Sequence, residues 1–270
     1  MKVNLKEEIR RNIINYVAQY ETAYGLDGIW RKPLVGFADA KSPYIQNLKN
    51  LIGRDHEMPQ DVMEDAKVVI AIFIPFTKKL GETNKLNEPL ASPEWAEAYE
   101  QTNKMLGNLN EHFILELAKK GYGGAISKEA LTYDQTMLTS NWSHRHFAYA
   151  AGLGTFGINN MLITKSGACG RYTSLVTNLD VPWDTPIGEE FCSYKKNGSC
   201  GICVKNCPGG ALTVEGYDRN KCYQLLQENA HVYTQSGSSY VNDDGTANSV
   251  GSEVCGKCTV YTPCAFWNLK

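Results

Sequence analysis

The chain has 270 residues, of which 43% are hydrophobic, and it carries a formal net charge of −2. This size allows one large domain or two smaller ones, with enough apolar residues for a substantial core. The isoelectric point of about 6.2 gives no electrostatic footprint for nucleic acid. The longest apolar run, residues 68–76, is far too short to span a membrane.

Residues before position 185 alternate helical and strand patterns. In chain order we expect a helix at 5–20, a strand at 34–38, a short helix from Ser42 to Leu51, a strand at 67–76, a polar surface loop at 78–91 and a long helix from Ser92 to Gly121. The β-branched run at 67–76 is typical of a strand buried on both faces.

Shorter elements follow. We expect a strand at 123–127, a helix at 141–151, and strands at 160–164 and 172–179 joined by a turn. The alternation predicts an α+β (α/β) fold with a mixed sheet for a first domain, residues 1–185. A cysteine-rich second domain, residues 186–270, is interrupted at 235–253 by a polar insertion that we expect to be mobile unless docked.

Eight of the nine cysteines lie in the last quarter of the chain, in two groups of four. The first group is Cys192, Cys200, Cys203 and Cys207, followed by Pro208, and the second is Cys222, Cys255, Cys258 and Cys264. The bacterial two-cluster ferredoxin run is C-x2-C-x2-C-x3-C-P, and its fourth cysteine binds the other cluster. Asn197 stands where the first cysteine of that run would fall, so Cys192 is the substitute.

Crossed ligation gives a definite assignment for two [4Fe-4S] clusters. The first cluster would be held by Cys192, Cys200, Cys203 and Cys264, and the second by Cys207, Cys222, Cys255 and Cys258. Zinc sites are an alternative, because paired C-x2-C motifs also bind zinc. Disulfides are a further alternative, but no signal peptide opens the chain. Nine cysteines without an export signal fit a reducing interior, so we expect a cytoplasmic protein.

A second dense segment precedes the cysteines. Gly152, Gly154 and Gly157 match the dinucleotide fingerprint G-x-G-x-x-G, but the required order of strand then helix is reversed here. The glycines still indicate a sharp turn or a close approach of the backbone. The lone Cys169 has no activating base nearby in the sequence, so we expect a structural or incidental thiol.

Several titratable residues surround this turn. Tyr133, Asp134, His144 and His146 are candidate proton donors, and Arg145 is a candidate cofactor contact. The alternative for the histidines is that one is exposed and the other packs in the core, because positions i and i+2 do not share a helix face. The alternative for Tyr133 and Asp134 is that they are ordinary loop residues.

The order of these motifs resembles the epoxyqueuosine reductase family, which is related to the reductive dehalogenases. The residues that carry the resemblance are A-x-x-A-G-L-G-x-x-G at 148–157, L-I-T at 162–164, Arg171, V-T-N at 176–178 and the cysteine module. The resemblance implies a nitroreductase-like corrinoid domain followed by a ferredoxin-like domain. It also implies a cobalamin held at Gly152, Gly154 and Gly157, which the clusters reduce and which acts on the substrate while a nearby acid supplies a proton.

The sequence departs from the family in three places. The region before the glycines is about four residues longer, with Asp134 as the equivalent of the family's aspartate, and the second cysteine group ends T-P-C-A-F-W. The chain also stops at Lys270, without the helical-repeat extension that helps the family hold tRNA. With the acidic isoelectric point, this departure leads us to expect that tRNA is not a partner. We therefore expect a short-form iron–sulfur oxidoreductase that reduces a small-molecule substrate and takes electrons from ferredoxin or flavodoxin. The alternatives are an electron-transfer or corrinoid-reactivating protein without its own substrate, and a binding module with structural metal.

Overall fold

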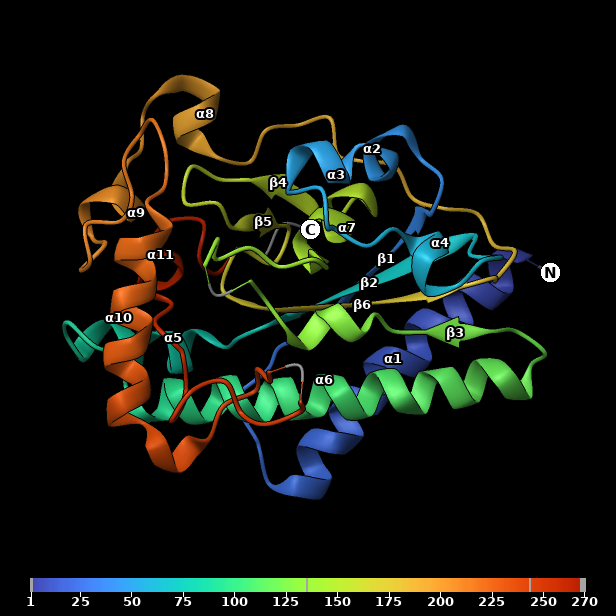
Figure 1. Cartoon of the computed structure of the whole chain (residues 1–270), viewed down its shortest axis with the longest axis horizontal. Coiled ribbons are helices and arrows are strands. Elements are labelled where there is room, and N and C mark those ends of the chain that lie inside the picture. The colour runs from blue at the N-terminus through green and yellow to red at the C-terminus, as the bar shows by residue number, and fades with distance from the viewer. Residues whose placement is uncertain (1, 135, 243, 268–270) are drawn as a thin grey trace.

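The computed structural model describes residues 2–134, 136–242 and 244–267 and is built around a four-stranded antiparallel sheet (Figure 1). The strand order is β1 (Leu34–Asp39), β2 (Val68–Pro75), β6 (Gly170–Thr177) and β3 (Gly124–Ala125). Each pairing in this sheet is antiparallel. The α+β prediction is therefore confirmed, whereas the predicted mixed sheet is wrong among the described residues.

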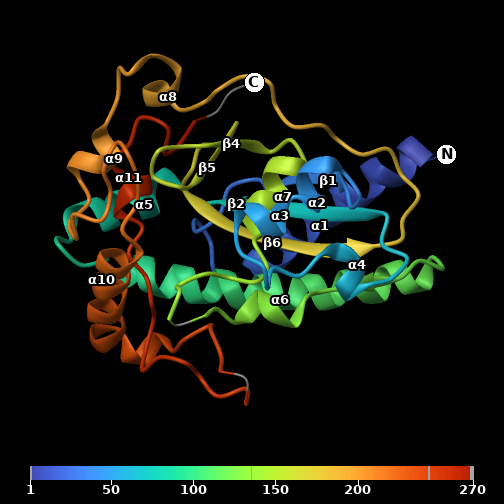
Figure 2. The ribbon, with the colours of Figure 1, turned by 45° about the horizontal axis from the view of Figure 1, so that its top comes forward.

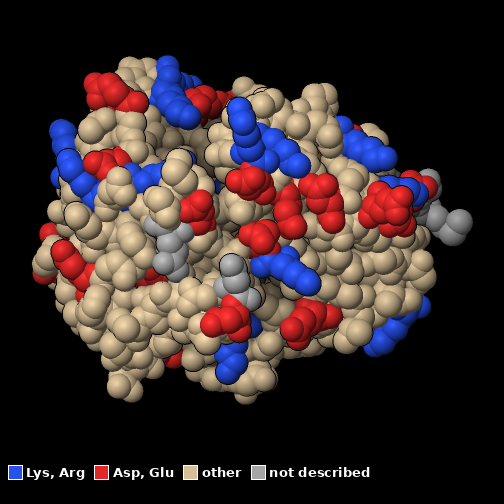
Figure 3. All heavy atoms as spheres, in the orientation of Figure 1, with Lys and Arg blue, Asp and Glu red and all other residues tan. Residues whose placement is uncertain are grey.

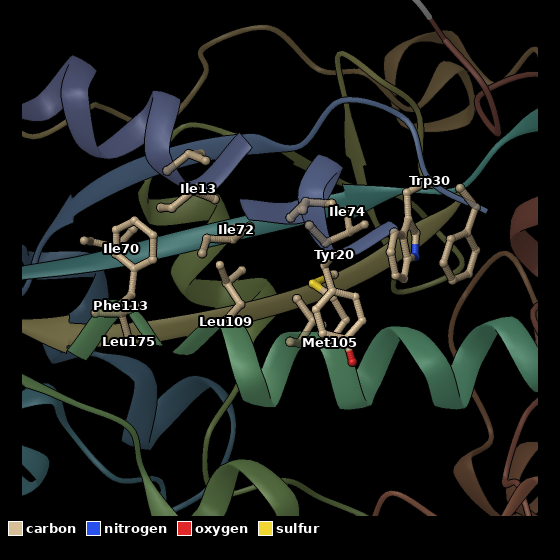
Figure 4. Packing of buried hydrophobic residues seen from close by; sticks show 14 of the residues in the cluster. Ile13, Tyr20, Trp30, Ile70, Ile72, Ile74, Met105, Leu109, Phe113 and Leu175 are labelled. Atoms are coloured by element: carbon tan, nitrogen blue, oxygen red, sulfur yellow. The ribbon is translucent and has the colours of Figure 1, made fainter. Parts of the chain in front are cut away.

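Strand β2 lies at the centre of the sheet, with Phe73 paired to Leu34 on one side and to Tyr172 on the other. All of its residues are buried, as the β-branched run predicts. Alternate side chains enter two different apolar clusters, because successive residues of a strand face opposite ways. Ile70, Ile72 and Ile74 face one layer of helices, as Figure 4 shows.

That layer consists of α1 (Lys2–Tyr24) and α6 (Pro93–Lys119), which lie along one face of the sheet (Figure 1). Both predicted helices are confirmed. Ser92 caps α6, since its hydroxyl accepts a hydrogen bond from Trp95 N at 3.1 Å. Met105, Leu109 and Phe113 of α6 meet the β2 isoleucines at the centre of this layer (Figure 4).

The opposite face is covered by α2 (Pro43–Gln46), α3 (Leu48–Leu51) and α7 (His144–Ala150). The single short helix predicted from Ser42 to Leu51 is two turns, separated at Asn47. Helix α7 approaches the sheet so closely that a Cβ at Gly36 would lie 2.5 Å from Ala151 O. This contact explains why glycine occupies the middle of a buried strand.

Small elements complete the sheet region. They are α4 (Pro59–Val62), the 3₁₀ turn η1 (Lys128–Leu131) and the hairpin of β4 (Gly154–Phe156) with β5 (Leu162–Thr164). The predicted strands at 34–38, 160–164 and 172–179 are confirmed with small shifts of their ends, and the predicted strand at 123–127 is reduced to Gly124–Ala125.

The cysteine module gathers at one end of the molecule, around the end of α6 that begins at Pro93 (Figures 1 and 2). Its elements are α8 (Ser193–Asn197), α9 (Ile202–Lys205), α10 (Arg219–Val232), η2 (Thr234–Ser236) and α11 (Lys257–Val260). Among the described residues, no helix is long and apolar enough to cross a membrane. The division into two domains at residue 185 stays a prediction.

The predicted polar loop at 78–91 is wrong, because it contains the helix α5 (Lys78–Leu86). Thr77 caps this helix by accepting a hydrogen bond from Leu80 N at 3.3 Å. The buried Lys257 donates from Nζ to the carbonyl oxygens of Asn84 and Asn87 at the other end. Tertiary contacts with the cysteine module thus override a local composition of glycine and asparagine that favours a loop.

The insertion at 235–253 is docked, apart from position 243, which lies outside the described residues. Val241 N donates to Leu131 O at 3.1 Å, and Ser252 Oγ donates to Glu100 Oε1 at 2.6 Å. The ring of Tyr240 lies edge-on to Tyr133, with centroids 5.4 Å apart. The insertion therefore packs on α6 and on the loop that carries two candidate proton donors.

Candidate redox site

Three cysteines surround Cys203 at one side of the module. Cys203 is buried, and burial raises the pKa of its thiol to about 11, with a further rise from its thiol neighbours. These neighbours are Cys264, Cys192 and Cys200. The same four side chains line one small cavity, although Cys264 is 61 residues from Cys203 in the sequence.

The other four cysteines form a second group. Burial raises the pKa of Cys255 to about 12, and the thiols of Cys222 and Cys207 add to the rise. Cys258 is half-buried, and its pKa is raised by burial and then by the thiols of Cys255, Cys222 and Cys207. The partition of eight cysteines into these two groups is the one that crossed ligation predicts, while ligation itself stays a prediction.

The two groups lie next to each other, since Cys203 of the first group is also among the neighbours that raise the pKa of Cys258. Buried thiols crowded in this way resist ionisation, and a bound cation would reverse that effect by favouring the thiolates. Among the described residues, no three or more His, Cys, Asp or Glu side chains converge tightly enough to hold a single metal ion. A cubane does not need such convergence, because each of its ligands binds a different iron atom.

A cavity of about 810 Å³ lies beside both cysteine groups. Three segments form its wall: the loop at 136–137, the turn at 157–160 and the start of α10 with the residues before it. The lining residues are Thr136, Met137, Gly157, Ile158, Asn160, Gly216, Tyr217, Asp218, Arg219 and Asn220. Gly157 and Ile158 also line the small cavity of the first cysteine group, so this turn separates the two spaces.

The turn at 157–160 is held by hydrogen bonds from both sides. Asn159 Nδ2 donates to Cys258 O at 2.9 Å, which ties the turn to the second cysteine group. Arg145 donates from Nη1 to Asn160 O at 2.5 Å. Asn160 has a φ of 58°, a left-handed conformation that asparagine tolerates better than most residues. Arg145, predicted as a cofactor contact, therefore supports the cavity wall from behind.

Nearby backbone atoms explain why glycine occupies positions 152 and 154. A Cβ at Gly152 would lie 2.3 Å from Thr185 O, and one at Gly154 would lie 2.1 Å from Ile163 O. Of the three glycines predicted to bind the cofactor, Gly157 lines the cavity, whereas Gly152 and Gly154 face other parts of the backbone.

The two histidines of α7 are both partly enclosed, so the alternative in which one is exposed does not hold. His144 Nδ1 lies 2.8 Å from Ser174 Oγ, and His146 Nδ1 lies 2.7 Å from Ser143 Oγ. Burial lowers the pKa of His144 to about 3 and that of His146 to about 4. Both rings are neutral at pH 7 and carry no acidic imidazolium proton, which disfavours them as proton donors.

Tyr133 and Asp134 lie in the loop that reaches the cavity through Thr136 and Met137. Tyr133 donates its hydroxyl proton to Glu253 Oε1 at 2.9 Å, and burial raises the pKa of Tyr133 above its ordinary value. The Asp134 carboxylate accepts hydrogen bonds from Thr136 N at 2.7 Å and Met137 N at 2.8 Å. Asp134 thus shapes the loop, and Tyr133 keeps its proton at neutral pH.

Sequence reasoning missed three residues of this site. Tyr217 and Arg219 line the cavity, and Glu253 is a buried carboxyl whose pKa is raised by burial. The signal for Tyr217 was its position five residues before a predicted ligand, Cys222. Cys169 lies fully buried in the apolar core, and its backbone N donates to Ala265 O at 3.2 Å.

Comparison with known proteins identifies curated epoxyqueuosine reductases as relatives. The curated epoxyqueuosine reductase of Lactococcus garvieae is 31% identical over 58% of this chain and 42% of its own length. That of Cyclobacterium marinum is 33% identical over 70% of this chain and 61% of its own length. The chain is similar to epoxyqueuosine reductases. It spans about half the length of these curated relatives, and no family model matches it.

The fold is that of a solved epoxyqueuosine reductase with an epoxyqueuosine-modified tRNA stem loop. That structure has a TM-score of 0.54 and 19% identity, and the match covers 98% of this epoxyqueuosine reductase-like chain and 66% of the other. Our expectation that tRNA is not a partner, which rested on the missing helical-repeat extension and on the acidic isoelectric point, is therefore wrong. Lysine and arginine are interspersed with acidic residues on the face in Figure 3, so overall charge says little about a local RNA contact.

Proposed function

We propose that this protein is an iron–sulfur and cobalamin-dependent reductase that acts on epoxyqueuosine in tRNA. The observation that carries the proposal is the grouping of eight cysteines as four and four beside one cavity of about 810 Å³. Adjacent groups of this kind suit two clusters that exchange electrons and deliver them to a bound molecule. A pure electron carrier would have no use for a cavity of this size, so the cavity favours the enzyme over that alternative.

The cavity suits the periphery of a corrinoid. Gly157 and Gly216 bring backbone to its wall without side chains, and Thr136, Asn160 and Asn220 offer polar groups suited to amide side chains of the ring. The described part of the lining contains neither histidine nor cysteine, so its residues would hold the group by its rim rather than through a cobalt ligand. When bound, cobalamin would supply low-potential reductive chemistry that amino-acid side chains lack.

The cavity mouth also suits a nucleoside in RNA. Tyr217 is 38% exposed and Met137 is 63% exposed, so each presents apolar surface on which a base can stack. The exposed Arg219 lines the same cavity and offers a guanidinium for a phosphate group. These features, together with the tRNA stem loop bound by the solved relative, support epoxyqueuosine in tRNA as the substrate.

For the proton that the reduction requires, we favour the loop carrying Tyr133 and Asp134. The raised pKa of Tyr133 keeps a proton on its hydroxyl, and the neighbouring Glu253 carboxyl, whose pKa burial raises, can accept or return one. Asp134 would become a donor only after its carboxylate releases the two backbone N–H groups of its own loop.

The test uses the whole chain, reconstituted anaerobically with iron, sulfide and cob(II)alamin and reduced chemically or with a ferredoxin or flavodoxin. It is incubated with an epoxyqueuosine-modified tRNA stem loop, and the nucleosides are separated by mass spectrometry. We expect the epoxyqueuosine nucleoside to be reduced. A protein that holds clusters and cobalamin but leaves epoxyqueuosine unchanged in both the stem loop and the free nucleoside contradicts the proposal.

A matched pair of variants sharpens this assay. Tyr133→Phe removes the hydroxyl that we favour as the proton source, and Tyr16→Phe removes a tyrosine hydroxyl from α1 on the far side of the sheet. We expect turnover to fall about 100-fold or more for Tyr133→Phe, as for loss of a general acid, and to stay unchanged for Tyr16→Phe.

A further inference from the structure

Glu253 connects the cysteine module to the loop that carries Tyr133. Its side chain is 6% exposed, and its Oε1 atom accepts hydrogen bonds from the Tyr133 hydroxyl at 2.9 Å and from Gln227 Nε2. The Tyr223 hydroxyl lies 3.1 Å from that of Tyr133, and the two rings meet edge-on. A buried carboxyl of the module therefore fixes where the Tyr133 hydroxyl lies.

Two further contacts join this loop to the polar insertion at 235–253. Val241 N donates to Leu131 O at 3.1 Å, two residues before Tyr133. The ring of Tyr240 meets that of Tyr133 edge-on, with centroids 5.4 Å apart. The base of the loop is thus held by backbone, ring and hydroxyl contacts, all of them with the cysteine module.

Beyond Tyr133 the chain makes a tight turn that reaches the large cavity. Asp134 N donates to Thr139 O at 2.9 Å, and Leu138 N donates to Asp134 O at 2.7 Å. Thr136 and Met137 of this turn line the cavity of about 810 Å³. Because the turn is closed by its own hydrogen bonds, a shift at its base would move the cavity wall with it.

The insertion is itself fixed to the sheet region through helix α6. Glu100 of α6 accepts hydrogen bonds from the hydroxyls of Ser239 and Ser252, the second at 2.6 Å. Asn103, one turn further along the helix, donates from Nδ2 to Ser239 Oγ at 2.9 Å. Since Ser252 directly precedes Glu253, these contacts set the position of the Glu253 carboxyl relative to the sheet.

We propose that Glu253 is a positioning residue, which holds the Tyr133 hydroxyl and the turn that follows it at the wall of the cavity. The inference rests on the proposed function for the role of Tyr133 as proton source, whereas the hydrogen bond does not depend on that role. A proton donor must lie within hydrogen-bond reach of the atom that it protonates, and a misplacement of about 1 Å can cost on the order of 100-fold in rate. Positioning needs only an acceptor oxygen, whereas proton exchange also needs an ionisable group, so substitution can separate the two.

The first experiment is hydrogen exchange of the whole reconstituted chain, read by mass spectrometry. We expect Glu253→Ala and Tyr133→Phe, which remove the hydrogen bond from opposite sides, each to speed exchange at residues 131–139 roughly 10-fold and to leave β2 unchanged. Glu253→Gln should exchange like wild type. It keeps the acceptor oxygen, and the Oε2 atom that its amide nitrogen replaces has no hydrogen-bond partner in the described part of the chain.

Glu228→Ala is the matched control, because Glu228 is an exposed glutamate on α10. Wild-type exchange at 131–139 in both Glu253→Ala and Tyr133→Phe overturns the proposal, and so does equal loosening in Glu228→Ala. If Glu253→Ala loses iron because of its nearness to Cys255, Tyr133→Phe decides, since it breaks the same hydrogen bond from the other side.

The second experiment is steady-state turnover of the epoxyqueuosine-modified stem loop. We expect Glu253→Ala to lower kcat about 10-fold or more with KM nearly unchanged, because it misplaces the donor and not the substrate, and Glu253→Gln to restore most of the rate. A Glu253→Gln variant that is as slow as Glu253→Ala overturns the positioning role in favour of proton exchange. A protein with two clusters that leaves epoxyqueuosine unchanged refutes the proposed function and leaves the exchange experiment decisive for Glu253.

Discussion

The sheet region and the cysteine module are stabilised by different interactions. Strand β2 is buried along its whole length between two large apolar clusters. Most side chains between positions 193 and 221 of the module are instead exposed. The apolar cluster beneath the first cysteine group is small, and one of its buried members is Cys192 itself.

Polar contacts join the two regions. Lys257 donates to two backbone carbonyls at the end of α5, and Asn84 Nδ2 donates to Cys255 O at 2.8 Å. Arg31 donates to Trp267 O at 3.1 Å and also to Ser166 O. Apolar contacts join them as well, because Val254, Val260 and Ala265 of the module belong to the same buried cluster as the inner face of α6. Residues 193–222 are not members of this cluster and depend more on whatever the cysteines bind.

Removing iron should reduce the stability of the cysteine module far more than that of the sheet region, and we expect this to be the largest of the effects predicted here. Because a bound cluster replaces the apolar core that the module lacks, we expect residues 193–222 to lose protection when the reconstituted protein is stripped of iron, while β2 and β6 keep theirs. Hydrogen exchange read by mass spectrometry measures both regions at once. Equal protection of the module with and without iron would contradict the comparison.

Shortening a buried side chain in the sheet tests whether apolar packing stabilises that region. Ile72 is fully buried against α6, so Ile72→Ala should lower the free energy of unfolding by about 2–5 kcal/mol. Val232→Ala is the control, since Val232 is 55% exposed. Urea unfolding measures both, and the iron content should stay at the wild-type level in each variant.

The pH dependence of stability tests a polar residue in the sheet region. His56 is fully buried, accepts a hydrogen bond from Ser143 N at Nε2, and has its pKa lowered to about 4 by burial. The unfolded chain binds this proton near pH 6.5 and the folded one near pH 4, so stability is fully present above pH 6.5 and declines as pH falls toward 4.

This decline should amount to on the order of 3 kcal/mol for His56 alone. We expect His56→Gln to lose part of the acid sensitivity that wild type shows between pH 7 and pH 5. Urea unfolding at both pH values gives the difference, and comparing the two proteins removes any shared effect of cluster loss. Identical pH dependence in the two proteins would show that His56 is not the group responsible.

The linker before the cysteine module should give a smaller effect. Asp184 accepts hydrogen bonds from Lys6 Nζ at 2.7 Å, Arg10 Nη2 at 2.8 Å and Phe37 N at 3.0 Å. Asp184→Asn should cost about 1–3 kcal/mol, because it leaves the charge of the buried Lys6 uncompensated. Glu7→Gln, at the exposed partner of Arg10, should leave the urea midpoint unchanged.

The sheet could be predicted from the sequence because its signals are local. The β-branched run of β2 and the Ser92 cap of α6 each determine their own element. Helix α5 could not be predicted, because Lys257 and Phe266 stabilise it from more than 150 residues away. The antiparallel pairing of β2 with β6 is likewise a long-range contact that the alternation of elements does not encode.

The site, like the sheet, has some features that local sequence signals predict and others that depend on long-range contacts. Cysteine spacing and the crossed rule predict two sets of four ligands, and which cysteines bind which cluster stays a prediction. The cavity could not be predicted, since it forms where the loop at 136–137, the turn at 157–160 and the start of α10 come together in space. The roles of His144 and His146 depended on burial, which their spacing alone does not reveal.

The central claim is that two clusters are held by crossed ligation. The most direct measurement is the iron content and electron paramagnetic resonance spectrum of anaerobically reconstituted wild type, Cys264→Ala, Cys203→Ala and Cys258→Ala. The account predicts about eight irons per wild-type chain and about four in each variant. It also predicts that the spectrum of Cys264→Ala matches that of Cys203→Ala. A spectrum that matches Cys258→Ala instead, or wild type without iron, would contradict it.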